Sequence, residues 1–265
     1  MELKAFLRTY TKKHFLSLAL HQEAVTLFGL SYAEVEAAAL AIGIVPLRYQ
    51  KNQSTITPAQ QKVLFDTHVA IIGCGGLGGH IAEILTRIGI GKLTLYDFDT
   101  FEEHNLNRQN FSTIADLGRN KVTVVKEGLQ KINPSITIEA LAERFDPKTD
   151  MPKIKTAAIV IDALDTPQTK QELAAQCCRR GIHFVHGAIA GMHGQFATDS
   201  TLEHLYPTTS RGAEIESGNP AFTVTLAASI QASEAIKTIL HMGEPLKNEF
   251  MFADLLHNEF EKLPL

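Results

Sequence analysis

Two groups of residues that could support chemistry lie close together in the sequence, between residues 73 and 121. The first is a glycine-rich turn, Gly73-Cys74-Gly75-Gly76-Leu77-Gly78, which follows an apolar segment. The second is a set of polar and charged side chains, namely Asp97, Asp99, Asn105, Arg108, Gln109 and Lys121. The glycines predict a nucleotide site, and the cations predict that phosphates of the nucleotide take part in a reaction.

The turn has the G-x-G-x-x-G spacing at Gly73, Gly75 and Gly78, and Gly76 is an additional glycine within it. In this pattern the first glycine permits the tight turn, and the second lets a phosphate approach the backbone. The third permits close packing of helix on strand, and the helix N-terminus then favours an anion. The motif alone is weak, but here it follows a strand and opens a helix, which is the context that it requires.

An acidic residue about twenty residues after such a turn is expected to bind the ribose hydroxyl groups of the nucleotide. Asp97 stands at that distance, at the end of the second strand, and we assign it to the ribose. Asp99 is expected to close the turn beside it, at the edge of the nucleotide site. These features alone would also fit an enzyme that uses a nicotinamide cofactor.

The cations separate these two possibilities. A dehydrogenase needs neither an arginine nor a lysine beside its reacting centre, whereas phosphoryl or nucleotidyl transfer needs positive charge where negative charge accumulates. Asn105, Arg108 and Gln109 follow the second strand, and Lys121 begins the next helix. As one spaced set, Asn105, Arg108 and Lys121 predict contacts with the phosphates, and Gln109 is expected to be part of the same nucleotide site.

Strands and helices alternate around this set. Strands are expected at residues 69–72, 92–96, 136–141, 157–161 and 183–186, and helices at 78–88, 121–132, 167–180 and 221–240. This alternation is typical of an α/β fold with a Rossmann-like, doubly wound and mostly parallel sheet. Residues 249–253 and 259–263 are expected to form a C-terminal antiparallel hairpin, and residues 200–217 a loop.

The N-terminal part has a different character. Residues 1–46 are expected to form a small helical appendage for packing or dimerisation, with a capping box at Ser31 and Glu34. A polar connector over 47–57 precedes a helix at 58–66, for which Thr57 is the predicted N-cap. We therefore divide the chain into an appendage, 1–46, and a nucleotide-binding domain, 47–265.

Bulk properties restrict the class of protein further. The chain has 265 residues, of which 45% are hydrophobic, and a net charge of −4, which disfavours nucleic acid as the main partner. Cys74, Cys177 and Cys178 are expected to be packing residues and form no disulfide framework. Neither a signal-peptide pattern nor an apolar run of about 18 residues is present. We expect a cytoplasmic protein without a membrane partner.

In combination, these motifs resemble the ThiF/MoeB/HesA family of adenylyltransferases, the bacterial relatives of ubiquitin-activating enzymes, over residues 48–265. The matching segments are the Gly73 turn, residues 95–100, 105–109, 118–121 and 132–134, the Asp162-Ala163-Leu164-Asp165 element, residues 187–195, and the last helix and hairpin. The resemblance implies adenylation, with ATP, of the C-terminal Gly-Gly carboxylate of a small ubiquitin-like sulfur carrier protein. Pyrophosphate would be released, in a thiamine or molybdopterin pathway.

The resemblance also implies roles for single residues. Asn105, Arg108 and Lys121 would contact phosphates, and Asp165 would organise Mg²⁺ near the reacting α-phosphate. Family members are homodimers in which an N-terminal arginine enters the partner's site, and Lys51 stands at that position here. Lysine keeps the charge but lacks the bidentate fork of arginine. In addition, Thr166 and Lys170 replace the asparagine and arginine that are usual in the family.

Other family features are missing. Relatives often bind a structural zinc ion through two Cys-x-x-Cys pairs, which this chain lacks, so we predict no structural zinc. His183, His186 and His193 are expected to be packing or pocket-edge residues rather than metal ligands. Residues 194–220 lack the cysteine with which other relatives form a thioester. The expected product is therefore the acyl-adenylate, released or passed to a separate sulfur donor.

Three alternatives stay open. The first is a tRNA threonylcarbamoyladenosine dehydratase or another adenylating enzyme of the superfamily, although residues 200–220 hold only Arg211 as a cation. The second is a non-catalytic nucleotide-binding subunit, which would typically have lost the arginine or the magnesium aspartate. The third is an oxidoreductase, which would bind NAD in preference to ATP.

Overall fold

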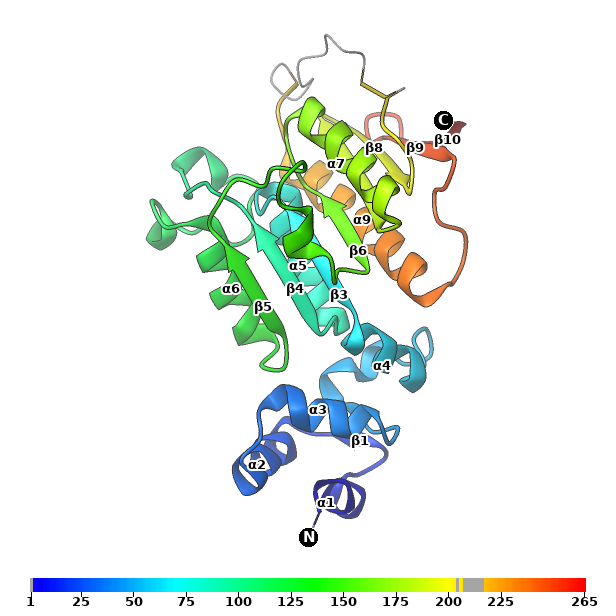
Figure 1. Ribbon diagram of the computed structural model, residues 1–265. Helices are drawn as coiled ribbons and strands as arrows, with labels where there is room; N and C mark the ends of the chain where they lie inside the picture. The colour runs from blue at the N-terminus through cyan, green and yellow to red at the C-terminus, as the bar shows by residue number, and fades with distance from the viewer. Residues whose placement is uncertain (1, 204, 207–216) are drawn as a thin grey trace.

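The computed structural model describes residues 2–203, 205–206 and 217–265. Within these residues, eight strands form one sheet in the order β10-β9-β8-β7-β6-β3-β4-β5 (Figure 1). The parallel strands are β3 (His68–Ile72), β4 (Lys92–Tyr96), β5 (Thr137–Leu141), β6 (Ile159–Asp162) and β7 (His183–Ala190). The antiparallel strands β8 (His193–Thr198), β9 (Glu249–Asp254) and β10 (Glu259–Pro264) extend the sheet beyond β7. The predicted fold class is confirmed.

Helices cover both faces of the parallel strands (Figure 1). The helices α5 (Gly76–Ile88), α6 (Lys121–Ile132) and α9 (Ala221–Leu240) share one core, and α7 (Pro167–Arg180) packs in the core on the other face. Val69 and Ile71 of β3 face the first core, whereas Ala70 and Ile72 face the second. A strand that is buried on both faces has no polar side, which explains its continuous apolar sequence.

The connections bring the polar loops to one edge of the sheet. From β3 the chain passes through α5 to β4 on one side, whereas β6 lies on the other side of β3. The strand order therefore reverses between β3 and β6, and ligands of open α/β sheets bind in the crevice at the carboxyl ends of such strands. Short 3-10 helices, η2 (Glu103–Asn105), η3 (Ile114–Asp116) and η4 (Met151–Ile154), lie in the loops.

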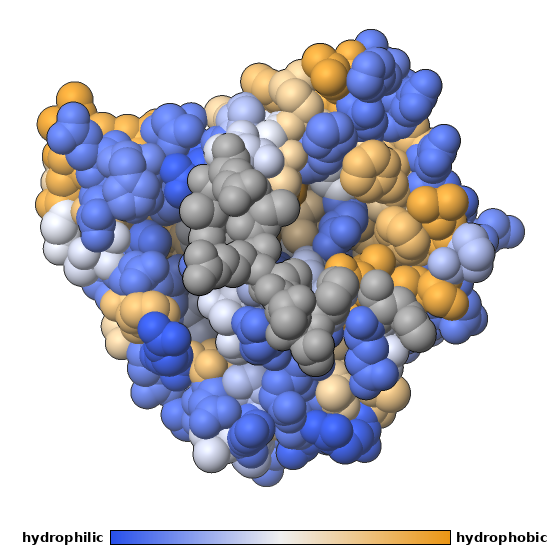
Figure 2. All heavy atoms as spheres, turned by 90° about the horizontal axis from the view of Figure 1, so that it is seen from above, coloured by the Kyte–Doolittle hydropathy of each residue, from blue (hydrophilic) through white to orange (hydrophobic). Residues whose placement is uncertain are grey.

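The view onto this edge shows mainly hydrophilic residues, and the larger group of apolar residues is on the right (Figure 2). That side is the one on which Figure 1 places β9 and β10. The hairpin has exposed apolar side chains at Leu256, Phe260 and Leu263. Among the helices that the structure describes, none is long and apolar enough to cross a membrane.

Several observed elements differ from the predicted ones in this domain, and β6 spans Ile159–Asp162 rather than 157–161. The helix α5 begins at Gly76 rather than at Gly78. The pattern predicts that β7 ends at His186, but β7 runs to Ala190 and pairs with β8, which is not predicted. Glycines at 187, 191 and 194 interrupt the alternation that would identify this hairpin. The loop predicted over 200–217, including Arg211, lies largely outside the described residues.

The first residues form a small cluster of their own, coloured blue in Figure 1. The helices α1 (Leu3–Tyr10), α2 (Leu18–Phe28) and α3 (Tyr32–Leu40) enclose an apolar core, and α3 begins with the predicted capping box. The strands β1 (Phe15–Leu16) and β2 (Val45–Pro46) add a short parallel pair, which corrects the purely helical prediction. The helix α4 (Pro58–Asp66), capped by Thr57 as predicted, leads into β3.

The segment after this cluster is more than a polar connector. Leu47–Asn52 forms the 3-10 helix η1, in which Tyr49 is buried and its hydroxyl accepts a hydrogen bond from Asn133 Nδ2 at 2.8 Å. Arg48 forms an ion pair with the buried Glu36 and donates to Ser135 Oγ at 2.8 Å. Because residues 133 and 135 join α6 to β5, these contacts fix the N-terminal cluster at the amino-terminal edge of the strands.

Candidate nucleotide site

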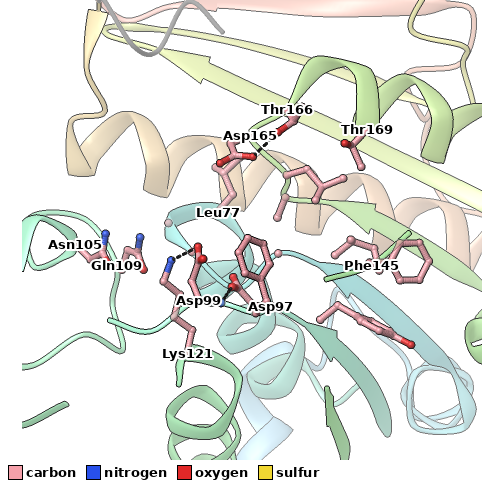
Figure 3. Close-up of a pocket in the computed structure, with 18 of the residues that line it drawn as sticks. Leu77, Asp97, Asp99, Asn105, Gln109, Lys121, Phe145, Asp165, Thr166 and Thr169 are labelled. Carbon is pink, nitrogen blue, oxygen red and sulfur yellow. Dashed lines mark hydrogen bonds and ion pairs between the residues drawn. The ribbon is translucent and has the colours of Figure 1, made fainter. Parts of the chain in front are cut away.

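A cavity of about 400 Å³ opens at the carboxyl ends of β3, β4 and β6 (Figure 3). Its walls come from the glycine turn, the segments after β4, β5 and β6, and the starts of α6 and α9. Ten of the predicted site residues line it, namely Gly73, Gly75, Gly76, Asp97, Asp99, Asn105, Arg108, Gln109, Lys121 and Asp165. Gly78 and Lys51 are not part of the wall.

The glycine turn shows why its spacing is needed. Gly73 has a φ of 102°, a left-handed value that favours glycine. A Cβ atom at Gly78 would lie 1.8 Å from the carbonyl oxygen of Gly73, so only glycine lets α5 pack against the turn. Gly78 therefore contributes to the site by allowing this packing, although it does not line the cavity. The first N–H groups of α5 have no partners within the helix and are available to an anion at the cavity.

Asp97 joins the glycine turn to the end of β4. Its Oδ2 accepts a hydrogen bond from Cys74 N at 2.7 Å, and its Oδ1 accepts one from Asp99 N at 2.8 Å. Burial raises the pKa of Asp97, although the two N–H donors and Lys121 oppose that shift. Each carboxylate oxygen has a second lone pair, so Asp97 can still accept a hydrogen bond from a ribose hydroxyl.

Asp99 does more than close the turn. Its Oδ2 lies 3.1 Å from Lys121 Nζ, and its backbone oxygen accepts a hydrogen bond from Lys121 N at 3.0 Å (Figure 3). The Lys121 side chain is only 8% exposed, whereas that of Asp99 is 48% exposed. Asp99 thus holds a nearly buried ammonium group at the cavity wall, where a phosphate could compete for it.

The loop around η2 supplies the other predicted phosphate contacts. Asn105 is buried, and its Oδ1 accepts a backbone hydrogen bond from the same loop at 3.0 Å. Arg108 donates from Nη1 to the oxygen of His104 at 2.9 Å and to Asn107 Oδ1 at 2.8 Å. Burial lowers the pKa of Arg108. Gln109 is buried, and its Oε1 has no hydrogen-bond partner within the described part of the chain.

Asp165 projects from the loop after β6, and its Oδ1 accepts a hydrogen bond from Thr166 Oγ1 at 3.0 Å (Figure 3). The fully buried Asp162 holds this loop, because its Oδ1 accepts a backbone hydrogen bond from it at 2.9 Å. Lys170 Nζ and His186 Nδ1 contact Asp162 Oδ2 at 3.1 Å and 2.7 Å. Burial disfavours the carboxylate, but Lys170 and His186 outweigh this effect and lower the pKa of Asp162.

One end of the cavity is aromatic, and the sequence motifs do not predict it. The guanidinium carbon of Arg144 lies 4.2 Å from the ring centroid of Phe98, and the rings of Tyr96 and Phe145 meet edge to face at 4.8 Å. All four residues line the cavity. In the sequence, only Phe98, which lies between Asp97 and Asp99, could have indicated this aromatic surface. No motif marks the residues after β5. Such a surface suits a planar base.

The polar and aromatic ends lie on opposite sides of the two aspartates. In Figure 3, Asn105 and Gln109 are on one side of Asp97 and Asp99, and Phe145 is on the other. A ligand with a base, a ribose and phosphates in that order would match this sequence of surfaces. Asn219 also lines the cavity and was not predicted from the sequence.

The remaining candidates lie elsewhere. Lys51 is exposed on η1, at the opposite edge of the strands. Cys74 and Cys177 are buried as expected, but Cys178 is exposed, which corrects its assignment as a packing residue. Burial raises the pKa of Cys177 to about 12. Within the described residues, no three His, Cys, Asp or Glu side chains are grouped to hold a metal ion.

Known proteins resemble this chain along most of its length. The sequence profile of the ThiF family matches residues 49–265. The molybdopterin-synthase adenylyltransferase of Salmonella typhimurium is 32% identical over 213 residues, which are 77% of this chain and 86% of that protein. The sulfur carrier protein adenylyltransferase of Thermus thermophilus is 28% identical over 222 residues, 78% of this chain and 82% of that protein.

Two further similarities bear on the alternatives. The tRNA threonylcarbamoyladenosine dehydratase of Haemophilus influenzae is 36% identical over 146 residues, which are only 55% of this chain and 54% of that protein. Among solved structures, E. coli MccB has a TM-score of 0.71 at 26% identity and covers 82% of this chain and 69% of that chain.

Proposed function

This chain belongs to the ThiF family, and on that basis we propose that it is an ATP-dependent adenylyltransferase that activates a sulfur carrier protein. Its acyl substrate would be the C-terminal Gly-Gly carboxylate of a small ubiquitin-like protein from thiamine or molybdopterin biosynthesis. The observation that carries this proposal is the cavity, which Arg108 and Lys121 line and in which Asn105 and Gln109 lie across Asp97 and Asp99 from Phe145 (Figure 3). Relatives named as adenylyltransferases support the same reaction.

The surfaces of the cavity support one orientation of ATP. The adenine would contact Phe98 and Arg144, and the ribose would bind Asp97. The triphosphate would then extend over the glycine turn toward Lys121 and Arg108. This order places both cations where phosphate charge must be neutralised.

The chemistry needs few protein groups. The substrate carboxylate is already ionised at neutral pH and attacks the α-phosphorus directly, so no general base is required. A bond forms between the carboxylate oxygen and phosphorus, and the bond to the leaving pyrophosphate breaks. The protein must align two anions and neutralise their charge, which Arg108 and Lys121 are suited to do.

Asp165 is the residue that would hold Mg²⁺. Magnesium in nucleotide sites is commonly bound through one or two carboxylates, with phosphates and water as further ligands. Asp165 is exposed, and Thr166 hydrogen-bonds only one of its oxygens, so the chemistry of this donor fits that mode. When bound, the ion would neutralise charge on the phosphates.

We further propose a homodimer in which Lys51 of one subunit serves the other subunit's site. Lys51 lies at the edge of the strands opposite its own cavity, so it can reach only the cavity of a second copy. The raised pKa values of Cys74 and Cys177 disfavour a thiolate, which supports an acyl-adenylate that a separate sulfur donor consumes.

ATP–pyrophosphate exchange tests the proposed reaction. We expect exchange that depends on a sulfur carrier ending in Gly-Gly and that disappears with a carrier from which the last glycine is removed. Absence of exchange with every such carrier would contradict the proposal. Turnover of ATP on tRNA without any carrier would instead favour the dehydratase, which the match to the Haemophilus influenzae protein keeps as the second candidate.

A further inference from the structure

The cavity contains a polar side chain to which the reaction described above gives no role. Asn219 lines the wall just before α9, close to Val224. Its Oδ1 is buried and has no hydrogen-bond partner among the residues that the structure describes. A buried acceptor without a donor is unfavourable unless a ligand supplies one. Asn219 therefore indicates a bound group that carries a hydrogen-bond donor.

Hydrogen bonds on both sides fix the position of Asn219. Asn107 donates from Nδ2 to the backbone oxygen of Asn219 at 3.3 Å, and Asn107 Oδ1 accepts the hydrogen bond from Arg108 Nη1 at 2.8 Å. Gly191, in the turn between β7 and β8, donates from its N–H to the oxygen of Gly218 at 2.8 Å. A single asparagine thus connects Asn219 to the arginine of the proposed phosphate site.

This position lies away from the aromatic end of the cavity. Arg108 belongs to the same loop as Asn105 and Gln109, which lie across Asp97 and Asp99 from Phe145 (Figure 3). The aliphatic part of the Arg108 side chain lies close to Gly76. A Cβ atom placed on Gly76 would lie 3.2 Å from the side chain of Val224. Asn219 is therefore on the side of the phosphates and of the β7–β8 hairpin.

The chemistry of the possible ligands identifies the donor. An ionised triphosphate has only acceptors, and the amine and hydroxyl donors of adenosine would lie toward Asp97 and the aromatic end. A polypeptide substrate brings the N–H group of its last peptide bond next to the carboxylate that must reach the α-phosphate. The asparagine amide has an acceptor and donors, so it can pair with both polar atoms of a peptide group.

We propose that Asn219 binds the last peptide group of the acyl substrate and that Asn107 holds Asn219 beside Arg108. The inference rests on the proposed function and specifies how a polypeptide C-terminus is recognised. Asn219 is then a specificity-determining residue, and Asn107 is a positioning residue. Together they align the substrate carboxylate with the arginine that neutralises the phosphates.

Steady-state kinetics of carrier-dependent pyrophosphate exchange test this inference. We expect Asn219→Ala to raise the KM for the carrier about tenfold, the loss that corresponds to one hydrogen bond. The KM for ATP should stay within about twofold of wild type, because phosphates do not use the Asn219 acceptor. Gln130→Ala removes an exposed amide on α6 and is the matched control, with no expected change.

Asn107→Ala separates positioning from binding. This variant frees both Arg108 and the backbone of Asn219, so kcat should fall and the carrier KM should rise, each by about tenfold. The KM for ATP should rise less than the carrier KM, because Lys121 and the glycine turn, which also face the triphosphate in the proposed orientation, do not contact Asn107. Asn219→Asp is nearly isosteric and provides a second variant at the binding position. Its negative charge would lie near the substrate carboxylate, so the carrier KM should rise at least as much as in Asn219→Ala.

Different outcomes would contradict the role of Asn219 and the proposed function. A rise in the KM for ATP with an unchanged carrier KM would show that Asn219 binds the nucleotide, and would overturn the inference. Wild-type kinetics in both Asn219 variants would overturn it as well. A wild-type protein without exchange with any Gly-Gly carrier would instead refute the proposed function.

Discussion

At the scale of single residues, the nucleotide site contains two ion pairs between lysine and aspartate side chains. Lys121 is nearly buried beside Asp99, and Lys170 is buried beside Asp162, so each ammonium has a carboxylate partner. The two pairs differ in exposure, because Asp99 is half exposed whereas Asp162 is inaccessible. Lys121 can therefore exchange its partner for a phosphate, and Lys170 stabilises the loop that carries Asp165.

The pair of Arg144 and Phe98 leads to a prediction at the same scale. If the base binds at this aromatic end, Phe98→Ala and Arg144→Ala should each raise the KM for ATP about three- to tenfold, since a stacked cation and ring contribute about 1 kcal/mol. The kcat should change little, because neither group is among the proposed phosphate contacts. Arg87→Ala, at an exposed position on α5, is the control. An unchanged KM for ATP in both variants would place the base elsewhere.

At the scale of elements, the N-terminal cluster is bound to the nucleotide domain by buried polar groups. Glu36 of α3 pairs with Arg48 of η1, which in turn reaches Ser135 before β5. His21 of α2 is buried in the same cluster, and its Nε2 donates to the oxygen of Tyr32 at 2.9 Å. Such contacts favour one defined arrangement of cluster and domain, because a broken pair would leave a buried charge without a partner.

The burial of His21 predicts a pH dependence of stability. Burial, with a smaller contribution from Arg48, lowers the pKa of His21 from 6.5 to about 4. Because the folded state binds the proton less well than the unfolded state, this stabilisation is complete above pH 6.5 and is lost as the pH falls toward 4. His21 alone should account for a loss of about 3 kcal/mol in the free energy of unfolding between pH 7 and pH 4.

Urea unfolding at several pH values measures this effect. His21→Phe keeps an aromatic ring against Tyr32 and removes the titration, so its unfolding free energy should depend less steeply on pH than that of wild type. His241→Asn, at an exposed position after α9, should leave the wild-type slope unchanged. Equal slopes for wild type and His21→Phe would show that His21 is not the responsible group.

At the scale of the whole molecule, the two ends of the parallel strands have separate tasks. The carboxyl ends carry the cavity, and the amino ends carry η1 and the N-terminal cluster. Lys51 is on the second of these ends and so has no place in its own cavity. The proposed homodimer gives this exposed cation a role, since a twofold axis can bring the η1 of one subunit to the cavity of the other.

Subunit mixing tests this arrangement. Lys51→Ala and Lys121→Ala should each lose most exchange activity. In a mixed dimer, the Lys51→Ala subunit keeps Lys121 in its own cavity and receives Lys51 from the Lys121→Ala subunit, so one of the two cavities is complete. Mixing the two inactive variants should therefore restore about a quarter of the wild-type activity, given random exchange of subunits. Lys148→Ala, at an exposed site, is the control. Full activity of Lys51→Ala alone would exclude the role of Lys51, and no recovery on mixing would exclude the shared site.

The sequence by itself determined the local features of this protein. The glycine spacing identified the turn because φ at Gly73 and the contact at Gly78 are set within six residues. Apolar runs and capping residues located the parallel strands and most helices for the same reason. The strand β8 was missed, because three glycines interrupt its hairpin and leave no alternation to recognise.

Only the tertiary structure decided which loops meet at the cavity. Arg144 stacks on Phe98 because β5 lies next to β4, and Asn107 bonds Asn219 although 112 positions separate them in the sequence. His186 and Lys170 converge on Asp162 because β7 pairs with β6 and α7 lies over them. These contacts depend on the order of strands in the sheet, which no short window of sequence specifies. The nucleotide turn could thus be predicted from its own residues, whereas the surfaces that surround the ligand arise from packing between distant segments.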